Sequence, residues 1–293
     1  MNPTPVVSIL IPSDGRASLR DTLASIGASR NAPDHEIILV GRLPDGMETP
    51  IPFVHFIACT GMGTGAMRNM AVSHAKGDLF LFTDSDCIVD PDWMARAARS
   101  CTPERPVVAG GIRFPETNPW DCGDNLAIFH ATHVSQRAGR AHGHVGTNNL
   151  AVRREVFSTL GGFDISLTVG EDGDFLARAA KAGYPAFFDP SFAVRHQSNR
   201  ETQTQVQAHA AWYASGYVNL LRSGILPHGK IRAESILPRH PRMASVWSGL
   251  KATLALARIV LPHPAFWRYR RSFAAAWIFL YARRRAVFRL LAE

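Results

Sequence analysis

Two aspartates stand two residues apart directly after an apolar run in the first third of the chain. Residues 79–82 read Leu-Phe-Leu-Phe, and Thr83, Asp84, Ser85 and Asp86 follow at once. Burying an unpaired carboxylate is costly, so this pair is expected to face solvent or a cation. Residues two apart on a strand share one face, where two carboxylates suit a hard divalent cation such as Mg²⁺ or Mn²⁺. The alternative is a solvated loop whose aspartates cap the next helix.

A second acidic pair, Glu171-Asp172, opens a predicted helix over residues 170–184. A carboxylate at that place is a candidate general base for removing the proton of an attacking hydroxyl. Acidic residues also favour helix N-termini for electrostatic reasons alone, so the pair has a purely structural alternative. His196 ends a predicted extended segment, 185–196, and is either a structural side chain or a ligand of a metal or phosphate.

A glycine-rich stretch, residues 61–69, leads into another predicted helix. A helix N-terminus attracts anions, and glycine allows the backbone to approach a phosphate. The stretch matches neither GxxxxGK[ST] nor GxGxxG, so it supports neither a P-loop ATPase nor a dinucleotide-binding fold. Arg68 and Asn69 either face a nucleotide or are ordinary surface residues.

These candidate residues need a frame, and the first 115 residues supply one by alternating strand and helix signals. Apolar strands that alternate with helices predict an open, mostly parallel sheet covered on both faces. Ligands bind beyond the carboxyl ends of such strands, where Ser13, Asp14, the loop after Val40 and the pair after Thr83 are expected to lie. The predicted strands are 5–12, 35–41, 51–59, 78–86 and 105–114, and the predicted helices are 17–29, 63–77 and 90–101, with Pro91 in the first turn of the last.

The second half of the chain gives a less regular pattern. A helix is predicted around 120–137, then a loop rich in Gly and His, a short strand with a helix over 148–164, and a helix near 201–222. From about 240 the chain is helical, aromatic and basic, over 243–262 and 266–292. Neither segment has 18 uninterrupted apolar residues, so we predict helices that lie at a membrane interface rather than spanning it. We therefore divide the chain into a body, 1–222, and a basic helical tail, 223–293.

Charge separates these two parts. Residues 1–194 hold 16 Lys and Arg against 21 Asp and Glu, whereas residues 195–293 hold 16 against 3. A basic tail indicates an anionic partner, which is nucleic acid, phospholipid or a polyanionic substrate. Residues 283–285 would suit nucleic-acid phosphates, but the apolar run 274–282 beside them fits lipid, or packing on the body, better. We expect no nucleic-acid partner. The four cysteines form no CxxC pair and no secretory leader follows Met1, which indicates the cytoplasm, with the protein peripheral on that face of the membrane.

Taken in order, these stretches resemble family 2 glycosyltransferases, which have the GT-A fold. The resemblance covers about residues 6–222, and the matching pieces are VSILIPSDGRASLRDTLASI, GAMRNMAVSHAKGDLFLFTDSDC, NNLAVRREVFSTLGGFD with VGEDGDFLARAAKAGY, and FAVRH. Each piece is unspecific alone, but the ordered set is specific. The resemblance implies an α/β fold of GT-A type and transfer of a sugar from a nucleotide-sugar donor, UDP-linked in most cases, to a hydroxyl of a glycan or lipid-linked acceptor, with inversion.

The resemblance also implies residue roles. Asp84 and Asp86 look like the DxD pair that holds Mn²⁺ or Mg²⁺ against the donor diphosphate, with Ser85 between them. His196 matches a histidine that completes the metal site. Asp172 would be the catalytic base, and Glu171 would support it or touch the acceptor. Three further residues, Pro12, Ser13 and Asp14, match the first nucleotide-binding loop, and Arg68 matches an arginine near the nucleotide.

One departure from the family stands after the second strand. The family usually has an acidic pair there whose first Asp contacts the base, whereas this chain has Gly41 and Arg42, with Asp45 further on. The departure raises an alternative function, a degenerate glycosyltransferase fold that recruits partners without turnover. The intact Asp84, Asp86, Asp172 and His196 favour the enzyme. Residues 116–146 are expected to shape the acceptor side.

Overall fold

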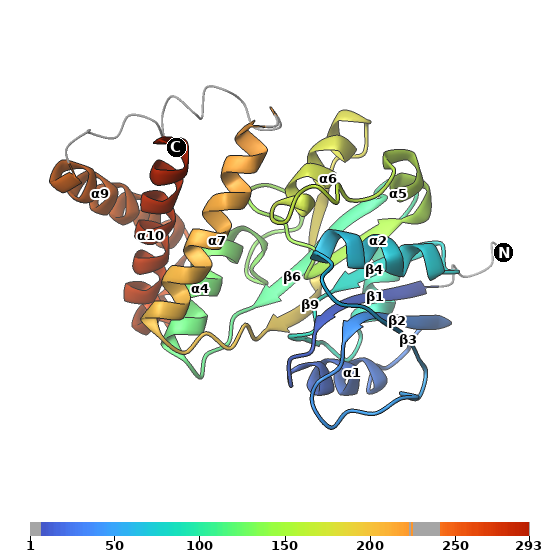
Figure 1. Cartoon of the computed structure of the whole chain (residues 1–293). Helices are drawn as coiled ribbons and strands as arrows, with labels where there is room; N and C mark the ends of the chain where they lie inside the picture. The colour runs from blue at the N-terminus through green and yellow to red at the C-terminus, as the bar shows by residue number, and fades with distance from the viewer. Residues whose placement is uncertain (1–6, 223, 225–240, 293) are drawn as a thin grey trace. The chain divides into compact units, whose positions relative to one another are not determined.

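The computed structural model describes residues 7–222, 224 and 241–292 (Figure 1). The first two residues of the predicted strand 5–12 lie outside this range, as does most of 223–240, the start of the predicted tail. The chain forms two compact units: unit 1 holds Met1–Arg113 and Ala131–Gln197, and unit 2 holds Phe114–His130 and Ser198–Glu293. Helices before residue 222 thus group with the tail helices. The predicted division into a functional body, 1–222, and a basic tail, 223–293, concerns function and stays a prediction.

Unit 1 is built on one mixed sheet whose path runs β3-β2-β1-β4-β8-β6-β9-β5, with β7 paired to β9. The first four strands of that path are parallel, and antiparallel pairings enter from β8 onward. The strands are β1 (Val7–Asp14), β2 (His35–Arg42), β3 (Val54–Ala58), β4 (Leu79–Thr83), β5 (Cys87–Val89), β6 (Val107–Arg113), β7 (Gly139–Arg140), β8 (Asn149–Arg153) and β9 (Phe187–His196). Sequence reasoning found all of them except the short β5 and β7.

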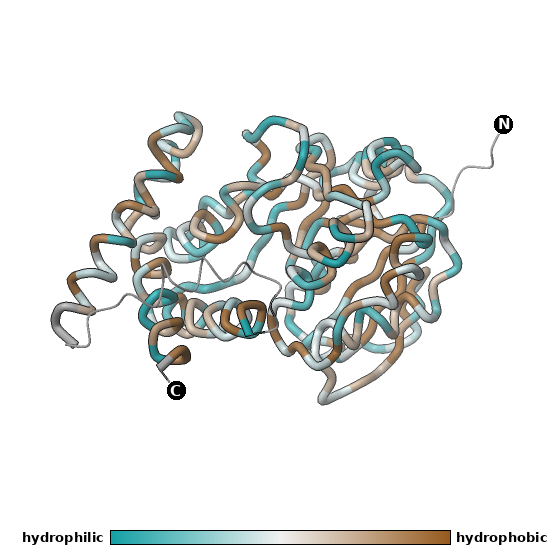
Figure 2. The backbone as a smooth tube through the Cα atoms, turned by 90° about the horizontal axis from the view of Figure 1, so that it is seen from above, coloured by the Kyte–Doolittle hydropathy of each residue, from teal (hydrophilic) through white to brown (hydrophobic). Residues whose placement is uncertain are grey.

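Alternation along the strands divides the core into two layers. On one face, Leu10, Phe80 and Phe82 belong to a cluster that also contains Phe157 and Phe175 from helices. The intervening residues of β1 and β4 are equally buried, so the opposite face is apolar too. Figure 2 shows the strands at the centre of unit 1 as hydrophobic segments. This pattern explains why the strand sequences read as uninterrupted apolar runs.

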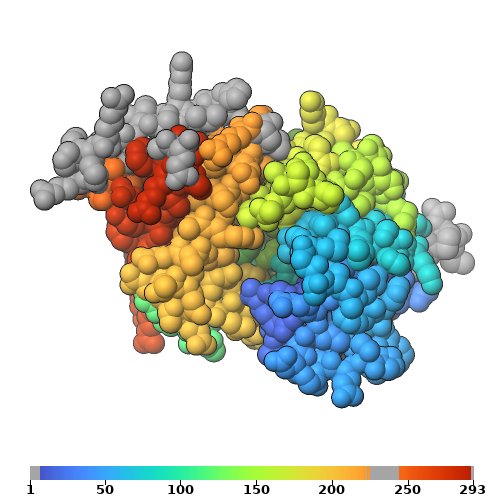
Figure 3. Space-filling model, in the orientation of Figure 1, coloured from blue at the N-terminus to red at the C-terminus, as the bar shows by residue number. Residues whose placement is uncertain are grey.

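Five helices accompany this sheet. The helices α2 (Thr64–His74), α5 (Arg154–Leu160) and α6 (Glu171–Lys181) contribute to the first core layer. The helices α1 (Leu19–Gly27) and α3 (Trp93–Ser100) contact β5 and β9 respectively. In α3 the N-cap is Asp92, so Pro91 precedes the helix instead of lying in its first turn. In Figure 3 the surface around α6 lies directly against the surface of α2 within unit 1.

The parallel pairing of β6 with β9 carries one irregularity. The pairing of β6 with β9 shifts between Gly110 and Gly111, where β9 contains Pro190 and cannot donate a ladder hydrogen bond. Asn149 of β8 crosses the gap by donating to the backbone oxygens of Gly111 and Phe192, at 3.0 and 3.2 Å. This bulge lets β9 continue to His196 at the far end of the sheet.

A hydrogen-bonded cluster closes the amino ends of the parallel strands. The Glu36 carboxylate accepts from the Ser8 hydroxyl at 2.7 Å and from the backbone N–H groups of Lys76 and Gly77. Burial tends to raise the pKa of Glu36, but these donors outweigh it and hold the pKa below its usual value. Arg154 donates to the Gly77 carbonyl and covers an aromatic ring of β4. Every polar group named here has a partner.

Unit 2 is a helical assembly around α10 (Phe273–Ala292). Helix α10 contacts α4 (Pro119–Phe129), α7 (Gln203–Arg222), α9 (Pro241–Val260) and the 3₁₀ segment η2 (Pro264–Ser272). Gly123 of α4 permits this packing, because a Cβ there would lie 2.5 Å from the Cβ of Ala275. The predicted helix over 120–137 ends at residue 129 and gives way to η1 (His130–Thr132).

Buried charges also hold unit 2 together. Asp124 of α4 accepts from His209 Nδ1 of α7 at 2.9 Å and lies 3.4 Å from Arg200. Asp121 accepts from the Ser198 hydroxyl and from the backbone of Asn199. Apolar residues of α10 serve the same packing, because Ala276 and Phe279 are fully buried. These buried side chains favour packing within unit 2, and a membrane-interface role for this helix stays a prediction.

Candidate functional site

The acidic sequence after β4 lies in a tight turn. The Cys87 N–H donates to the Asp84 carbonyl at 3.2 Å, which closes the turn before β5 begins. The expectation that Asp84 and Asp86 share one face of a continuing strand was therefore wrong in its geometry. Ser85, at the tip, is buried. The turn still brings both carboxylates to the carboxyl end of β4.

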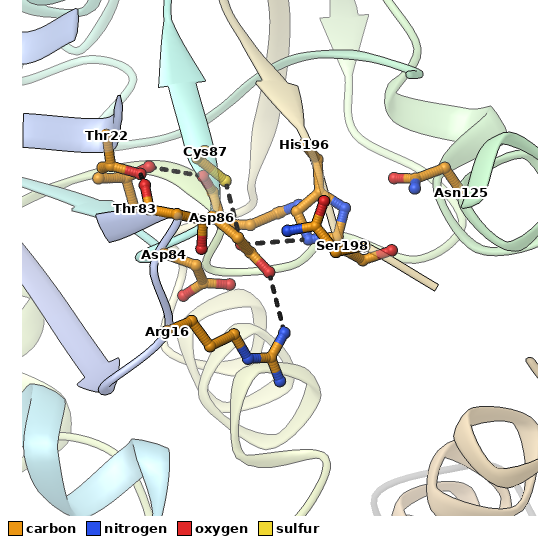
Figure 4. Close-up of polar contacts among 12 residues, drawn as sticks. Arg16, Thr22, Thr83, Asp84, Asp86, Cys87, Asn125, His196 and Ser198 are labelled. Atoms are coloured by element: carbon orange, nitrogen blue, oxygen red, sulfur yellow. Dashed lines mark hydrogen bonds and ion pairs between the residues drawn. The ribbon is translucent and has the colours of Figure 1, made fainter. Parts of the chain in front are cut away.

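Asp86 lies between the guanidinium of Arg16 and the imidazole of His196 (Figure 4). Its carboxylate is 3.5 Å from Arg16 Nη1 on one side and 3.5 Å from His196 Nε2 on the other. His196 pairs across β9 and β5 with Cys87, whose thiol is 3.9 Å from the same carboxylate. Burial, together with Asp86 and Asp84, raises the pKa of the Cys87 thiol well above its usual value.

Asp84 is joined to the second acidic pair through Arg68. The Arg68 guanidinium donates to Asp84 at 2.7 Å and to Glu171 at 2.8 Å, and only 4% of its side chain is exposed. Burial tends to lower the pKa of Arg68, but the Asp84 and Glu171 carboxylates outweigh that effect and raise it. Arg68 thus fixes the turn after β4 against the N-terminus of α6.

Helix α6 is placed by close packing on α2. Gly170 precedes it in a left-handed conformation with φ of 91°, which turns the chain into the helix. Thr64 donates to Glu171 at 2.9 Å. A Cβ on Gly65 would meet the Glu171 side chain at 3.1 Å, so glycine lets the two helices approach. The first residues of α6 are consequently held by side chains and backbone of α2.

The acidic pair of α6 resists ionisation. Burial is the main cause that raises the pKa of Asp172, and the Arg68 charge opposes it only in part. Burial and the Asp172 charge likewise raise the pKa of Glu171. A carboxylate whose pKa is raised is a stronger base toward a hydroxyl proton than an ordinary surface carboxylate. Such perturbation is common at functional sites.

The ends of β1 and β2 form the remaining part of this edge. The Ser13 hydroxyl donates to the Arg42 carbonyl at 2.7 Å, and Arg42 donates to the Asp14 carbonyl at 2.6 Å. Gly41 has φ of 131°, and a Cβ there would lie 2.0 Å from the Ser13 oxygen. Glycine is therefore required at position 41, where the family usually has an acidic residue, because the backbones of β1 and β2 approach closely there. Pro12 lies within β1 beside these residues.

Unit 1 thus gathers the predicted residues at the carboxyl ends of its strands. Direct contacts connect Asp84 to Glu171 through Arg68, and Asp86 to His196. Asp45 instead lies on the loop after β2 and is exposed, with its carbonyl accepting from Arg20. The expected role of residues 116–146 on the acceptor side stays a prediction.

Three contributors were missed by sequence reasoning: Arg16, Thr64 and Cys87. Arg16 pairs with Asp14 at 2.6 Å and lies 3.5 Å from Asp86. It therefore adds positive charge beside the end of β1 and beside the turn after β4. Its signal was present, since it follows the first loop directly. The role of Thr64 had no sequence signal, because its partner lies 107 residues away.

The donor set at this edge fits a divalent cation. Ligand atoms of Asp86, Cys87 and His196 all lie within 4.8 Å of one another, and all three residues are buried. Carboxylate and imidazole are both common ligands of divalent ions in proteins. Among the residues that the structure describes, this is the group of three or more His, Cys, Asp and Glu with that spacing.

Comparison with known proteins gives three findings. The model of the family described as "Glycosyltransferase like family 2" matches residues 3–215. The O-antigen biosynthesis protein RfbC of Myxococcus xanthus is 29% identical over 187 residues, which are 55% of this chain and 15% of that protein. The glycosyltransferase AglE of Haloferax volcanii is 27% identical over 128 residues, 43% of this chain and 41% of that protein. The matches thus span less than half the length of either curated relative.

The structural comparison concerns the fold. A mannosyltransferase from Pyrobaculum calidifontis, PcManGT, solved in complex with GDP-Man and Mn²⁺, superposes with a TM-score of 0.60 at 19% identity. The match covers 96% of this chain and 86% of the other. The predicted α/β fold of GT-A type, with a helical C-terminal extension, is confirmed.

Proposed function

The chain belongs to glycosyltransferase family 2, and we propose that it transfers a sugar from a nucleotide-sugar donor to a hydroxyl group with inversion at the anomeric carbon. The observation that carries the proposal is the bridge from Asp84 through Arg68 to Glu171. It holds the turn that would receive the donor diphosphate against the helix that begins with the candidate base. A fixed distance between the donor-binding turn and the candidate base suits a reaction in which donor and acceptor must be held in one geometry.

Asp172 is the proposed base. Its raised pKa suits removal of the acceptor hydroxyl proton while the oxygen attacks the anomeric carbon. Attack comes from the face opposite the leaving diphosphate, so the configuration inverts. Glu171 is committed to Arg68 and Thr64, which suits it to holding the start of α6. The aspartate is left to take the proton.

Asp86 and His196 would hold a divalent cation, Mn²⁺ or Mg²⁺, with Asp84 beside it. Such an ion supplies charge compensation for the departing diphosphate. Arg16 is half-exposed and already 3.5 Å from Asp86, so its guanidinium is placed to bind a donor phosphate from the solvent side. Arg68 is buried and paired on both sides, which suits orientation of carboxylates; contact with the nucleotide stays a prediction.

The donor is proposed to be a nucleoside diphosphate sugar held near Pro12, Ser13 and Asp14. The solved structure with a similar fold holds GDP-Man, whereas the sequence resemblance to the family implies a UDP-sugar. Arg42 stands at the end of β2 and is exposed, so it presents donors where the family usually presents carboxylates. A base that offers acceptor atoms is the better match for such an edge. GDP-mannose and UDP-hexoses are therefore the first donors to test.

The acceptor is proposed to be a glycan or lipid-linked intermediate, with the protein peripheral on the cytoplasmic face of the membrane. No helix among the described residues is both long and apolar enough to cross a bilayer. Helix α9 instead exposes Val246, Leu250 and Leu254, which share one helix face, and Leu261 follows its end. Arg258 beside them is exposed. Apolar side chains with flanking cations suit anionic lipid.

Liposome binding tests this surface. The full chain should co-sediment with vesicles containing anionic phospholipid at low salt and dissociate as the ionic strength rises. Leu250→Glu should weaken binding, whereas Gln207→Glu, an equal charge change at an exposed position of α7, should not. Equal binding of both variants would show that α9 is not the membrane-binding surface. Absence of binding by the wild type would overturn the proposed membrane association.

A donor panel tests the transferase itself. Purified protein with Mn²⁺ or Mg²⁺ is incubated with GDP-, UDP- and dTDP-sugars, and nucleotide release and thermal stabilisation are measured. We expect one donor to be hydrolysed slowly in a metal-dependent reaction that Asp86→Ala abolishes. Failure of every donor to bind or react would overturn the proposal and favour a fold that binds partners without turnover.

A further inference from the structure

The thiol of Cys87 is aimed at the same point as the two groups proposed to hold the cation. Its sulfur is 3.9 Å from Asp86 Oδ1, and that oxygen is 3.5 Å from His196 Nε2. All three ligand atoms lie within 4.8 Å of one another. These separations agree with ligand bonds of roughly 2.0–2.3 Å to a shared ion. Figure 4 shows Cys87 and His196 on either side of Asp86, which lies in the turn before β5.

The backbone fixes this arrangement. Cys87 and His196 form a cross-strand pair on β5 and β9, so their side chains lie on the same face of the sheet. Asp86 precedes Cys87 directly, and its carbonyl accepts from the Gln197 N–H at 2.9 Å, which extends the pairing of the two strands. Sites held by paired strands are more rigid than sites on loops. The three donors are therefore preorganised by the end of one ladder.

We propose that Cys87 is the third protein ligand of this cation, and that the Asp-Cys-His set makes the site select a transition-metal ion over Mg²⁺. Mg²⁺ requires nearly ideal octahedral geometry and oxygen ligands, and it binds thiolate and imidazole poorly. Three protein ligands of this kind leave positions open, as in catalytic zinc sites. The affinity should rise from Mn²⁺ to Co²⁺. A coordinating thiol releases its proton to solvent.

The alternative is a purely structural role, in which Cys87 packs as a small apolar residue. The other cysteines of the chain give the contrast. Cys101 ends α3, and Cys122 belongs to the packing of unit 2. Cys59 follows β3 and is partly exposed. Among the described residues, Cys87 is the cysteine found in a group with candidate metal ligands.

Cobalt spectroscopy tests the ligand directly, without any transfer reaction. The chelator-treated full chain is titrated with Co²⁺, and the near-ultraviolet thiolate-to-cobalt charge-transfer band is recorded. We expect the band in the wild type and in Cys59→Ser, which controls for adventitious binding at the partly exposed thiol. The band should disappear in Cys87→Ser and Cys87→Ala. It should also be lost in His196→Ala, which leaves the thiol itself intact.

Competition with Mg²⁺ gives the second measurement. The ratio of the dissociation constants for Mg²⁺ and Co²⁺ should fall by about tenfold or more in Cys87→Ala, because Co²⁺ loses a ligand that Mg²⁺ does not use. Melting temperatures of the metal-free variants establish that they fold. If both Cys87 variants unfold, the His196→Ala spectrum decides. Cobalt binding without a thiolate band in the wild type, or a band that persists without Cys87, would overturn the assignment.

This inference rests on the proposed metal site, but its failure is distinguishable from failure of the proposed function. A chain that turns over a donor with Co²⁺ bound and shows no thiolate band would keep the transferase and lose Cys87 as ligand. A chain that shows the band and turns over no donor would keep the thiolate site and lose the transferase.

Discussion

The two ends of the parallel strands in unit 1 place carboxylates in opposite surroundings. At the amino ends, Glu36 accepts hydrogen bonds from Ser8 and from two backbone N–H groups, and its pKa is lowered. At the carboxyl ends, Glu171 and Asp172 crowd around Arg68, and the pKa of each is raised. The first arrangement favours the ionised form in the folded state, and the second opposes it. One end of the sheet thus contributes stability, whereas the other retains reactive groups at its expense.

The largest effect should come from removing the base. Asp172→Asn should reduce turnover by about 10²–10⁴-fold, the usual contribution of a general base. The stability of Asp172→Asn, in contrast, should not fall. Because the folded-state pKa of Asp172 is raised, folding favours the protonated form; that contribution is full below the unfolded-state pKa and is lost as pH rises through the folded-state pKa. The variant, neutral at every pH, should therefore melt at or above the wild-type temperature near pH 7.

Turnover assays and melting curves at pH 4.5 and 7.5 check this prediction. The advantage of Asp172→Asn in melting temperature should shrink at the lower pH, where the wild-type carboxyl group is more protonated. Asp164→Asn, at an exposed position before α6, is the matched control and should keep turnover. A large loss of stability at pH 7.5 in Asp172→Asn would contradict the comparison between the two ends.

Arg68 is the exception at the carboxyl end, because it carries stability. Arg68→Met leaves Asp84 and Glu171 without their cation, and removing one partner of a buried ion pair costs about 3–5 kcal/mol. We expect the lower part of that range, since Asp84 is partly exposed. Denaturant unfolding measures the loss. In Arg68→Met with Glu171→Gln, part of the stability should return, and strict additivity of the two changes would argue against a direct pair.

Gly41 should show a smaller effect of purely steric origin. Gly41→Ala forces a Cβ onto the Ser13 carbonyl in a backbone conformation that favours glycine, which should cost about 1–3 kcal/mol. The exposed neighbour Arg42→Ala should change stability by no more than about 0.5 kcal/mol. Chemical unfolding of both variants compares them. Equal stability of the two would show that β1 and β2 do not approach as closely as described.

Much of this frame was predictable from sequence. The uncharged strands around Leu10 and Phe80 and the glycine-led helices required only local patterns, and the resemblance to family 2 glycosyltransferases is confirmed by the family match. The Arg68 bridge was not predictable, because it joins residues 103 positions apart. Nor was the burial of α10: a helix with apolar residues around Phe279 reads alike whether lipid or protein covers it.

The smallest effect tests the amino end. Glu36→Gln keeps the shape of the side chain but loses charge-assisted acceptance from Ser8 and the backbone of Lys76 and Gly77. Because the folded-state pKa of Glu36 is lowered, its contribution is present above the unfolded-state pKa and is lost as pH falls through the folded-state pKa. The carboxylate is partly exposed, so we expect about 1 kcal/mol, or a fall in Tm of about 2–4 °C at pH 7.

Melting curves as a function of pH decide whether the two ends differ as described. The deficit of Glu36→Gln should be present at pH 7 and fade toward pH 3, whereas the advantage of Asp172→Asn should be present at pH 7.5 and fade at pH 4.5. Turnover of Glu36→Gln should match the wild type, because Glu36 bonds to Ser8, Lys76 and Gly77 at the amino ends of the strands. A deficit that stays unchanged down to the pH at which the wild-type carboxylate is protonated would assign the loss to packing, because the charge is then absent from both proteins.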